Sequence, residues 1–419
     1  MSFTSIPILD LALAQDPETK PQFLEDLRHA LMEVGFLYLK NVGIPDELFQ
    51  RVVREGKAFF DIPTEEKYCN LLYSGECEPR VGKSKRTGLT IFPRLRIEMK
   101  NAKSFLGYSQ LSAEITAGKI DHREQIDLST EHPLPSPDDP LHYNLLAPNQ
   151  WPSEFALPGF RATFTEYMER MGAISIAFTS LIAEAIKIPP SAFSKYFDAN
   201  QQHKLKIVKY PDLQELGITD PAIQGQGVGP HKDSMLSSYL LQASHHRGLQ
   251  VQNVRGEWID APPVEGTLVV AIGQGLEALT QGVCVSTTHR VLSPAAGQGA
   301  RFSIPFFQGV RGDAEFEDLE TVGVGQVPED IKEQRRAVLE RNGGTRLDDV
   351  EFTFRKGGVA KTLGEATLRN RIKSHPDVGE RWYPEILAAI RMEEARAAAA
   401  KEGNAKGVPA TSAVVVPAH

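Results

Sequence analysis

The stretch VCVSTTHRVLSPAAGQGARFSIPFF, residues 283–307, holds two strand-like runs separated by a turn that is rich in glycine and proline. The runs are Val283–Val291 and Arg301–Phe307. Because side chains alternate between the two faces of a strand, Arg301 and Ser303 share one face of the second run, opposite an apolar face. Further runs of this kind occur at Lys204–Tyr210, Met235–Gln242, Leu249–Gln252 and Thr267–Ala271. Short strands punctuated by glycine and proline predict a β-barrel or β-sandwich.

Helical patterns flank this β region on both sides. The N-terminal part mixes short strands at Ile6–Asp10 and Phe36–Leu39 with helices, which is typical of an α/β region. The expected helices are one that carries Phe23, Leu24, Leu27 and Leu31, and those at Asp46–Phe60, Phe160–Ile186, Pro328–Asn342 and Glu380–Lys401. We therefore expect a mostly β fold with flanking helices and an α/β N-terminal region.

These patterns divide the chain into four expected parts. Residues 1–150 form an N-terminal region, and residues 151–320 form the β core. Residues 321–401 form a helical C-terminal extension. Residues 402–419 are rich in Ala, Gly, Val and Pro, and we expect a disordered tail there.

Composition narrows the class of protein. The 419 residues are 41% hydrophobic, which is typical of a globular protein with a sizeable core. A formal net charge of −8 argues against nucleic acid or an anionic membrane as the main partner. No apolar run is long enough to span a bilayer, and the N-terminus lacks the pattern of a signal peptide. Only three cysteines occur, so we expect a cytoplasmic protein without disulfides, and we expect a monomer.

Residues 69–96 interrupt the N-terminal region with a segment that has no sustained periodicity. The segment holds six Lys and Arg residues against two Glu residues, although the whole chain is acidic. One interpretation is a basic lid over a substrate, and another is a surface insertion without a defined role. A third hypothesis is that the segment is the translated product of an unremoved intron.

Three residues have the types and spacing of metal ligands. His231 and Asp233 are two positions apart, so an extended backbone directs both side chains to one side. His289 reaches the same ion only if its strand lies beside that of His231, as a jelly roll allows. Two imidazoles and one carboxylate form the ligand set of non-haem Fe(II) oxygenases. The same set also supports Zn²⁺, but the helical H-E-x-x-H signature of zinc hydrolases is absent. We expect the remaining histidines to face solvent.

Arg301 and Ser303 offer a fork of donors and a hydroxyl on one strand face. A guanidinium binds a carboxylate through two parallel hydrogen bonds, and burying it without an anion is costly. The two interpretations are a salt bridge to an acidic residue of the chain and a site for the distal carboxylate of a keto acid. Tyr210, at the end of another predicted strand, can add a phenol hydroxyl to that carboxylate.

These motifs resemble the isopenicillin N synthase-like family of Fe(II)/2-oxoglutarate-dependent dioxygenases. GFLYLKNVGIP (35–45) and FFDIPTEEK (59–67) are similar to the N-terminal domain of that family. LKIVKYP (205–211), HKD (231–233), STTHRVLSP (286–294) and RFSIPFF (301–307) follow its oxygenase core in order. The resemblance covers residues 5–310, apart from the insertion.

The resemblance implies a double-stranded β-helix, or jelly-roll, core. It implies that His231, Asp233 and His289 bind Fe(II), that Arg301, Ser303 and Tyr210 bind 2-oxoglutarate, and that O2 is the oxidant. The implied reaction hydroxylates, desaturates or cyclises a small organic metabolite and releases succinate and CO2. Val208 departs from the pattern, because relatives often carry an asparagine there that helps to hold the keto acid.

Three alternatives remain open from the sequence. The first is an iron oxidase of the same fold that does not use 2-oxoglutarate. The second is an ethylene-forming enzyme, to which Gly107-Tyr108 and EITAGKIDHREQ (114–125) are faintly similar. The third is a β-barrel binding protein whose metal site is inactive. The identity of the substrate lies beyond the sequence.

Overall fold

The computed structural model describes residues 2–63, 97–116, 118–220, 225–315, 327–342 and 360–406, and two short strands between residues 64 and 96. Those strands, β3 (Gly82–Lys83) and β4 (Thr90–Ile91), pair with each other. The rest of the insertion at residues 69–96 lies outside the described residues, so its three interpretations stay hypotheses. Residues 407–419 of the expected tail also lie outside them.

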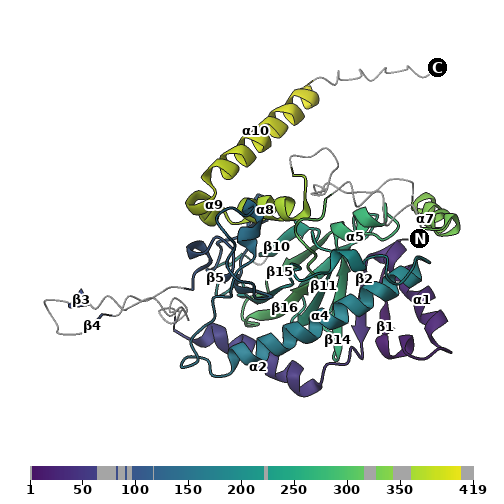
Figure 1. The fold of residues 1–419 in the computed structure, drawn as a ribbon, viewed down its shortest axis with the longest axis horizontal. Helices are drawn as coiled ribbons and strands as arrows, with labels where there is room; N and C mark the ends of the chain where they lie inside the picture. Colours follow the sequence, from purple (N-terminus) through teal and green to yellow (C-terminus); the bar gives the residue numbers. More distant parts are fainter. Residues whose placement is uncertain are drawn as a thin grey trace, which may run out of the picture.

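A large twisted sheet forms one layer of the β core (Figure 1). Within the described ranges its strands run in the order β1-β2-β14-β11-β16-β9-β8-β5. Their bounds are β1 (Ile8–Asp10), β2 (Phe36–Lys40), β14 (Thr267–Ile272), β11 (Ser237–Gln242), β16 (Arg301–Phe307), β9 (Lys204–Tyr210), β8 (Glu124–Ser129) and β5 (Gly107–Ser109). Strands from the N-terminal region therefore extend the sheet at both edges.

A smaller sheet faces the large one across an apolar layer. Its order is β10 (Gln226–His231), β15 (His289–Leu292), β12 (Leu249–Gln252) and β13 (Trp258–Asp260). Val208 from the large sheet and Val228, Val251 and Val291 from the small one belong to this buried layer. Strands distant in sequence alternate between two sheets that share one core, which is the jelly-roll arrangement. The predicted fold class is confirmed.

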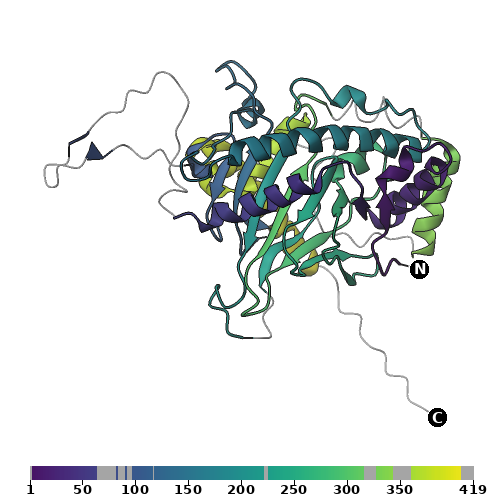
Figure 2. The ribbon, with the colours of Figure 1, turned by 90° about the horizontal axis from the view of Figure 1, so that it is seen from below.

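Helices cover the outer face of the large sheet. α4 (Phe160–Ala185) and α2 (Asp46–Asp61) run side by side across it (Figure 2). Aromatic and Met side chains along one face of α4 are buried in the core cluster that also holds Leu205 and Phe306. α1 (Lys20–His29) continues into a π-helical turn, Ala30–Val34, that ends at Gly35 with a positive φ of 69°. A side chain at position 35 would collide with the backbone of Val285.

The helices at Leu363–Ser374 and Pro376–Trp382 pack beside the β core near β5 and β10, whereas the helix at Glu329–Arg341 lies at the other end of the molecule, beside α1 (Figure 1). α8 (Leu363–Ser374) is absent from the sequence prediction, whereas α7 (Glu329–Arg341) and α10 (Pro384–Lys406) lie close to their predicted ranges. α9 (Pro376–Trp382) joins α8 to α10. Together α8, α9 and the start of α10 bury a separate cluster with Phe105. Within the described residues, none of the helices combines the length and the apolarity that crossing a bilayer requires.

Shorter elements complete the described chain. They are α5 (Gln274–Leu279), the strands β6 (Ile115–Thr116) and β7 (Lys119–Ile120), and 3-10 turns at Leu11–Ala14, Met99–Asn101, Leu141–Leu145 and Ser194–Tyr196.

The predicted strand at Val283–Val291 is wrong over most of its length. Only His289–Leu292 is a strand, β15. The preceding residues are instead tied to the π-helical turn, because the Val285 amide donates to the Leu31 carbonyl and the Thr287 hydroxyl donates to the Val34 carbonyl. Their β-branched side chains suit an extended backbone, but these tertiary hydrogen bonds replace a sheet ladder.

Candidate active site

The three predicted metal ligands lie together at one end of the small sheet. β10 ends at His231 and β15 begins at His289, and the two residues are partners in the antiparallel register. Their ring centroids are 4.2 Å apart. Oδ1 of Asp233 lies 3.7 Å from Nε2 of His231 and 3.8 Å from Nε2 of His289. One ligand atom from each residue lies within 4.8 Å of the others, a spacing that can hold a metal ion.

Hydrogen bonds to the backbone orient both imidazoles. Nδ1 of His231 is 2.8 Å from the Gly229 carbonyl oxygen, and Nδ1 of His289 is 3.2 Å from that of Thr287. A carbonyl oxygen only accepts, so each Nδ1 carries the proton and each Nε2 presents a lone pair to the centre. This is the arrangement in which protein groups usually hold metal-binding histidines.

The carboxylate of Asp233 is held from its other side. Ser238, on β11, donates a hydrogen bond to Oδ2, which leaves Oδ1 directed toward the two Nε2 atoms. The carbonyl of Asp233 also accepts a hydrogen bond from the Gln274 amide at 2.7 Å, so the loop itself is anchored to α5. The carboxylate thus belongs to a short loop after β10 and not to the strand itself.

Burial keeps the imidazoles in the form that binds a metal. It lowers the pKa of His231, and burial together with the neighbouring His231 lowers the pKa of His289 to about 4. Both rings are therefore neutral near pH 7. The donor set of two neutral imidazoles and one carboxylate fits a non-haem Fe(II) ion.

Arg301 is buried on the inner face of the large sheet with unused hydrogen-bond donors. Its Nε and Nη1 atoms are buried and lack a hydrogen-bond partner, while Nη2 donates to Gln242 Oε1 at 3.3 Å. Burial lowers the pKa of Arg301, because the site solvates the guanidinium charge poorly. Within the described ranges no carboxylate forms an ion pair with Arg301. The unused donors fit the carboxylate of a keto acid.

Two hydroxyl groups border the same position. Ser303 Oγ lies 3.4 Å from the Tyr210 hydroxyl, and the guanidinium of Arg301 lies over the Tyr210 ring, 5.0 Å from its centroid. The register of β9 and β16 causes this grouping, since Arg301 is the partner of Tyr210 and Ser303 that of Val208. Val208 is apolar and buried, so its side chain offers no polar contact there.

A cavity of about 650 Å3 connects the metal-ligand cluster with Arg301. Phe307 contributes an apolar part of the cavity wall. Phe306 and Leu241 belong instead to the core beneath the large sheet, because they point to the opposite strand face.

The structure adds cavity residues that the sequence interpretation missed. Glu114, Arg123 and Lys206 line the cavity from the N-terminal half, and Asn370 and Arg371 line it from α8. In the sequence the EITAGKIDHREQ segment shows only a faint similarity to ethylene-forming enzymes, and no local signal connects α8 with the cavity.

The prediction that the remaining histidines face solvent is wrong for three of them. His142, His203 and His375 are all buried. His203 Nδ1 accepts a hydrogen bond from the Gly309 amide, and His375 packs against the ring of Phe105. Their burial depends on tertiary neighbours, which no local pattern reveals.

Comparisons with known proteins agree with this geometry. A family model described as "2OG-Fe(II) oxygenase superfamily" matches residues 202–310. A second, "non-haem dioxygenase in morphine synthesis N-terminal", matches residues 6–74 and 94–154, so residues 75–93 fall between its two matched parts.

Curated relatives match almost the whole chain. The chain is 63% identical over 398 residues to the 2-oxoglutarate-dependent dioxygenase frbJ of Dothideomycetidae sp. (strain 11243), covering 94% of this chain and 97% of that one. It is 36% identical over 403 residues to a 2-oxoglutarate-dependent dioxygenase of Gibberella zeae, covering 94% and 95%. Among solved structures, a full-length Neurospora crassa protein in complex with alpha-KG and thymine superimposes with a TM-score of 0.58 at 23% identity, covering 80% and 97%. That likeness shows the shared fold alone.

Proposed function

The chain belongs to the 2OG-Fe(II) oxygenase superfamily, and we propose that His231, Asp233 and His289 are the ligands of its Fe(II). The observation that carries this proposal is the convergence of three ligand atoms, within 4.8 Å of one another, from two paired strands and the loop between β10 and β11. The hydrogen bonds that fix both imidazole tautomers support it. The protein is a 2-oxoglutarate-dependent dioxygenase that uses Fe(II), 2-oxoglutarate and O2.

Arg301, Ser303 and Tyr210 would bind the distal carboxylate of 2-oxoglutarate. The unpartnered Nε and Nη1 atoms of Arg301 supply the charge and the donors, and the adjacent hydroxyls supply further hydrogen bonds. Gln242 holds the guanidinium from the side by accepting from Nη2. The carboxylate would thereby restore the solvation that burial removes from Arg301.

When bound, Fe(II) with 2-oxoglutarate and O2 supplies the oxidation of a substrate C–H bond, with release of succinate and CO2. The chain's own residues bind and orient the reactants and exclude water. Ser238 keeps Asp233 in place, and the apolar side chains of Leu240, Val269 and Phe307 along the cavity limit the access of solvent. The substrate is a small organic molecule.

The proposed function also includes the location of the protein in the cell and its oligomeric state. We infer that the protein acts in the cytoplasm, because only three cysteines occur and Cys284 is a buried free thiol. We also propose that it is a monomer. Size-exclusion chromatography with light scattering tests the monomer, and a dimer mass would contradict it.

Anaerobic titration of the purified protein with Fe(II) and 2-oxoglutarate tests the site assignment. The expected result is a visible metal-to-ligand charge-transfer band in the wild type and its loss in His289→Ala. Arg301→Ala should remove the band at 2-oxoglutarate concentrations that saturate the wild type. His203→Ala is the matched control, since it removes a buried imidazole outside the ligand cluster. A band of unchanged intensity in His289→Ala would contradict the proposed ligand set.

A further inference from the structure

The active-site cavity has a second polar region, away from Arg301, that combines many charged groups. Arg123 forms ion pairs with Glu114 at 2.8 Å and Asp121 at 3.1 Å. Lys206 lies 3.4 Å from Glu114 and 3.7 Å from Asp127. These cations and carboxylates therefore satisfy one another.

Arg371 completes this paired network from α8. It forms an ion pair with Asp127 at 2.8 Å and donates to the Phe105 carbonyl. The cations of the network are Arg123, Lys206 and Arg371, and the carboxylates are Glu114, Asp121 and Asp127. Their formal charges balance, so the network as a whole offers little net attraction to a ligand.

Lys204 lies in the same region of the cavity but does not belong to the paired network. Its Nζ atom is buried and has no hydrogen-bond partner. Within the described ranges no carboxylate lies within ion-pair distance of it, and the nearby Asp127 is already engaged by Lys206 and Arg371. An unpaired buried ammonium is costly, so the position is unfavourable for stability alone and suits a ligand.

The register of the large sheet separates Lys204 from the 2-oxoglutarate clamp. Lys204 and Tyr210 are the first and last residues of β9, so about 20 Å of extended strand lies between them. In the sheet register, Lys204 of β9 is instead paired with Phe307 of β16, and Phe307 is paired in turn with Ser238 of β11. Two strand spacings therefore place the backbone of Lys204 roughly 10 Å from that of Ser238, whose hydroxyl holds Asp233. Lys204 lies on the metal side of the cavity and not on the keto-acid side.

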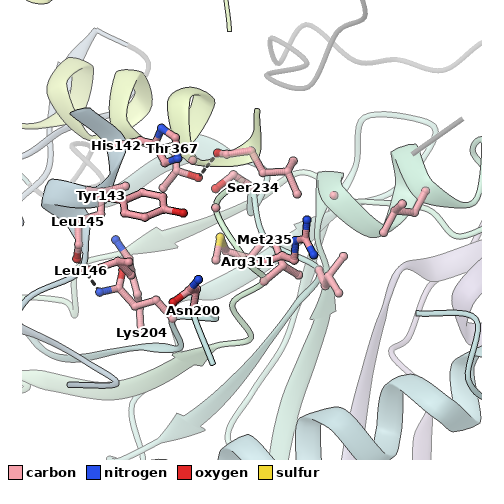
Figure 3. Close-up of a pocket in the computed structure, with 18 residues that line it drawn as sticks. His142, Tyr143, Leu145, Leu146, Asn200, Lys204, Ser234, Met235, Arg311 and Thr367 are labelled. Carbon is pink, nitrogen blue, oxygen red and sulfur yellow. Dashed lines mark hydrogen bonds between the residues drawn. The ribbon is translucent and has the colours of Figure 1, made fainter. Parts of the chain in front are cut away.

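An apolar side pocket of about 50 Å3 adjoins the cavity at this point. Lys204, Ser234, Met235 and Thr367 line both spaces, so the pocket opens where Lys204 lies. Figure 3 shows Lys204 on the opposite side of this pocket from Thr367. The pocket has room for a short apolar group but not for a whole substrate.

We infer that the ammonium of Lys204 binds an anionic oxygen group of the oxidised substrate, a carboxylate, while a short apolar part of the same molecule enters the side pocket. This inference rests on the proposed function, because it takes the Fe(II) and 2-oxoglutarate sites as given. The substrate class is therefore a small organic acid with an apolar group near its carboxylate. The neighbouring ion pairs of the paired network limit where the anion can lie.

Isothermal titration calorimetry on the full chain, loaded anaerobically with Fe(II) and saturating 2-oxoglutarate, tests this inference. The probes are butyrate, hexanoate and phenylacetate, each matched by its primary amide. We expect at least one acid to bind the wild type about tenfold more tightly than its amide, and Lys204→Met to abolish that preference. Lys204→Arg should retain it, since the charge remains. Lys332→Met, which removes a lysine from α7 outside both spaces, should behave as the wild type.

Failure of the Lys204 assignment and failure of the proposed Fe(II) and 2-oxoglutarate sites give different results. Retention of the preference in Lys204→Met, or no preference for any acid in a wild type that forms the charge-transfer band, would overturn the assignment of Lys204. Failure of the wild type to form that band would count against the proposed Fe(II) and 2-oxoglutarate sites instead. The band in Lys204→Met also reports that this variant is folded.

Discussion

His231 and His289 are register partners across the antiparallel pair of β10 and β15, although 57 positions separate them in the chain. Their partnership places two Nε2 atoms at nearly equal distances from one oxygen of Asp233. The metal-ligand geometry is therefore a consequence of strand pairing, and only Asp233 depends on a loop. Hydrogen bonds that hold this loop and its carboxylate should therefore control the affinity of the site for its metal ion.

Ser238→Ala should weaken Fe(II) binding by about tenfold, because Asp233 Oδ2 loses the hydroxyl that orients it. Equilibrium titration under anaerobic conditions measures the change in Kd. Ser237→Ala is the matched control, since that hydroxyl bonds to Gln308 and not to Asp233. Equal metal affinity in Ser238→Ala and Ser237→Ala would show that the hydrogen bond to Asp233 does not matter.

Arg301→Lys should raise the Kd for 2-oxoglutarate more than Tyr210→Phe does. Lysine keeps the charge but loses the planar fork, at a cost of about 1.5–3 kcal/mol, which is roughly 10- to 150-fold. Tyr210→Phe removes one neutral hydroxyl, worth about 1 kcal/mol or roughly fivefold. The charge-transfer band provides the titration signal. The reverse order of the two effects would refute the clamp as described.

Binding of an anion near Lys204 should weaken as pH rises. Burial, together with the nearby charges of Arg371 and Lys206, lowers the pKa of Lys204 well below its usual value, with Asp127 opposing them. A bound carboxylate favours the ammonium and raises that pKa again. At a pH between the pKa of Lys204 in the free protein and its higher pKa in the complex, binding takes up a proton. The affinity for the anion therefore falls with increasing pH.

Calorimetry of the acid probes in two buffers with different ionisation enthalpies measures this proton uptake. A buffer-dependent enthalpy is expected in the wild type and not in Lys204→Met. Lys204→Arg should bind the acids without proton uptake, since arginine remains charged. The same buffer dependence in all three proteins would assign the proton to another group.

Deletion of residues 75–93 should leave the 2-oxoglutarate site intact. These residues fall between the two matched parts of the N-terminal family model, and the described strands β3 and β4 pair only with each other. We expect a Kd for 2-oxoglutarate within about twofold of the wild type, since the family model matches the chain on both sides of these residues without them. Deletion of residues 115–120 is the contrasting control, because Ile115 and Thr116 line the cavity.

A deletion variant that fails to fold would show that the segment is an integral part of the protein. Sequencing of the spliced transcript decides separately whether the segment is translated at all. A transcript that encodes it would refute the intron hypothesis.

Local alternation was enough to locate the strands that carry the proposed keto-acid clamp. β9 and β16 have the predicted bounds, Lys204–Tyr210 and Arg301–Phe307, because alternating polar and apolar residues mark a strand between two different environments. The convergence of His231, Asp233 and His289 was also predicted, although β10, which ends at His231, is not among the predicted strands. That difference arises because the glycine-rich run before His231 gives no apolar signal of a strand.

Features that depend on distant contacts were not predictable. Residues 283–288 look like a strand, yet their hydrogen bonds go to Leu31 and Val34. α8 has no strong apolar stripe and is fixed by tertiary contacts such as the ion pair of Arg371 with Asp127. Lys204 and Lys206 look equivalent on one strand face, and only the folded arrangement shows that one of them is paired and the other is not.

The contribution of α8 to the cavity wall has an evolutionary consequence. The helix supplies Thr367, Asn370 and Arg371 to the same cavity as the metal-ligand cluster, yet it follows that cluster by some seventy or more positions and shares no strand with it. Substitutions in α8 can therefore reshape the space available to a substrate while the residues proposed to hold iron and keto acid stay unchanged. Relatives that differ mainly in this helix should accept different molecules and perform the same chemistry on them, so that selectivity and reactivity can diverge independently.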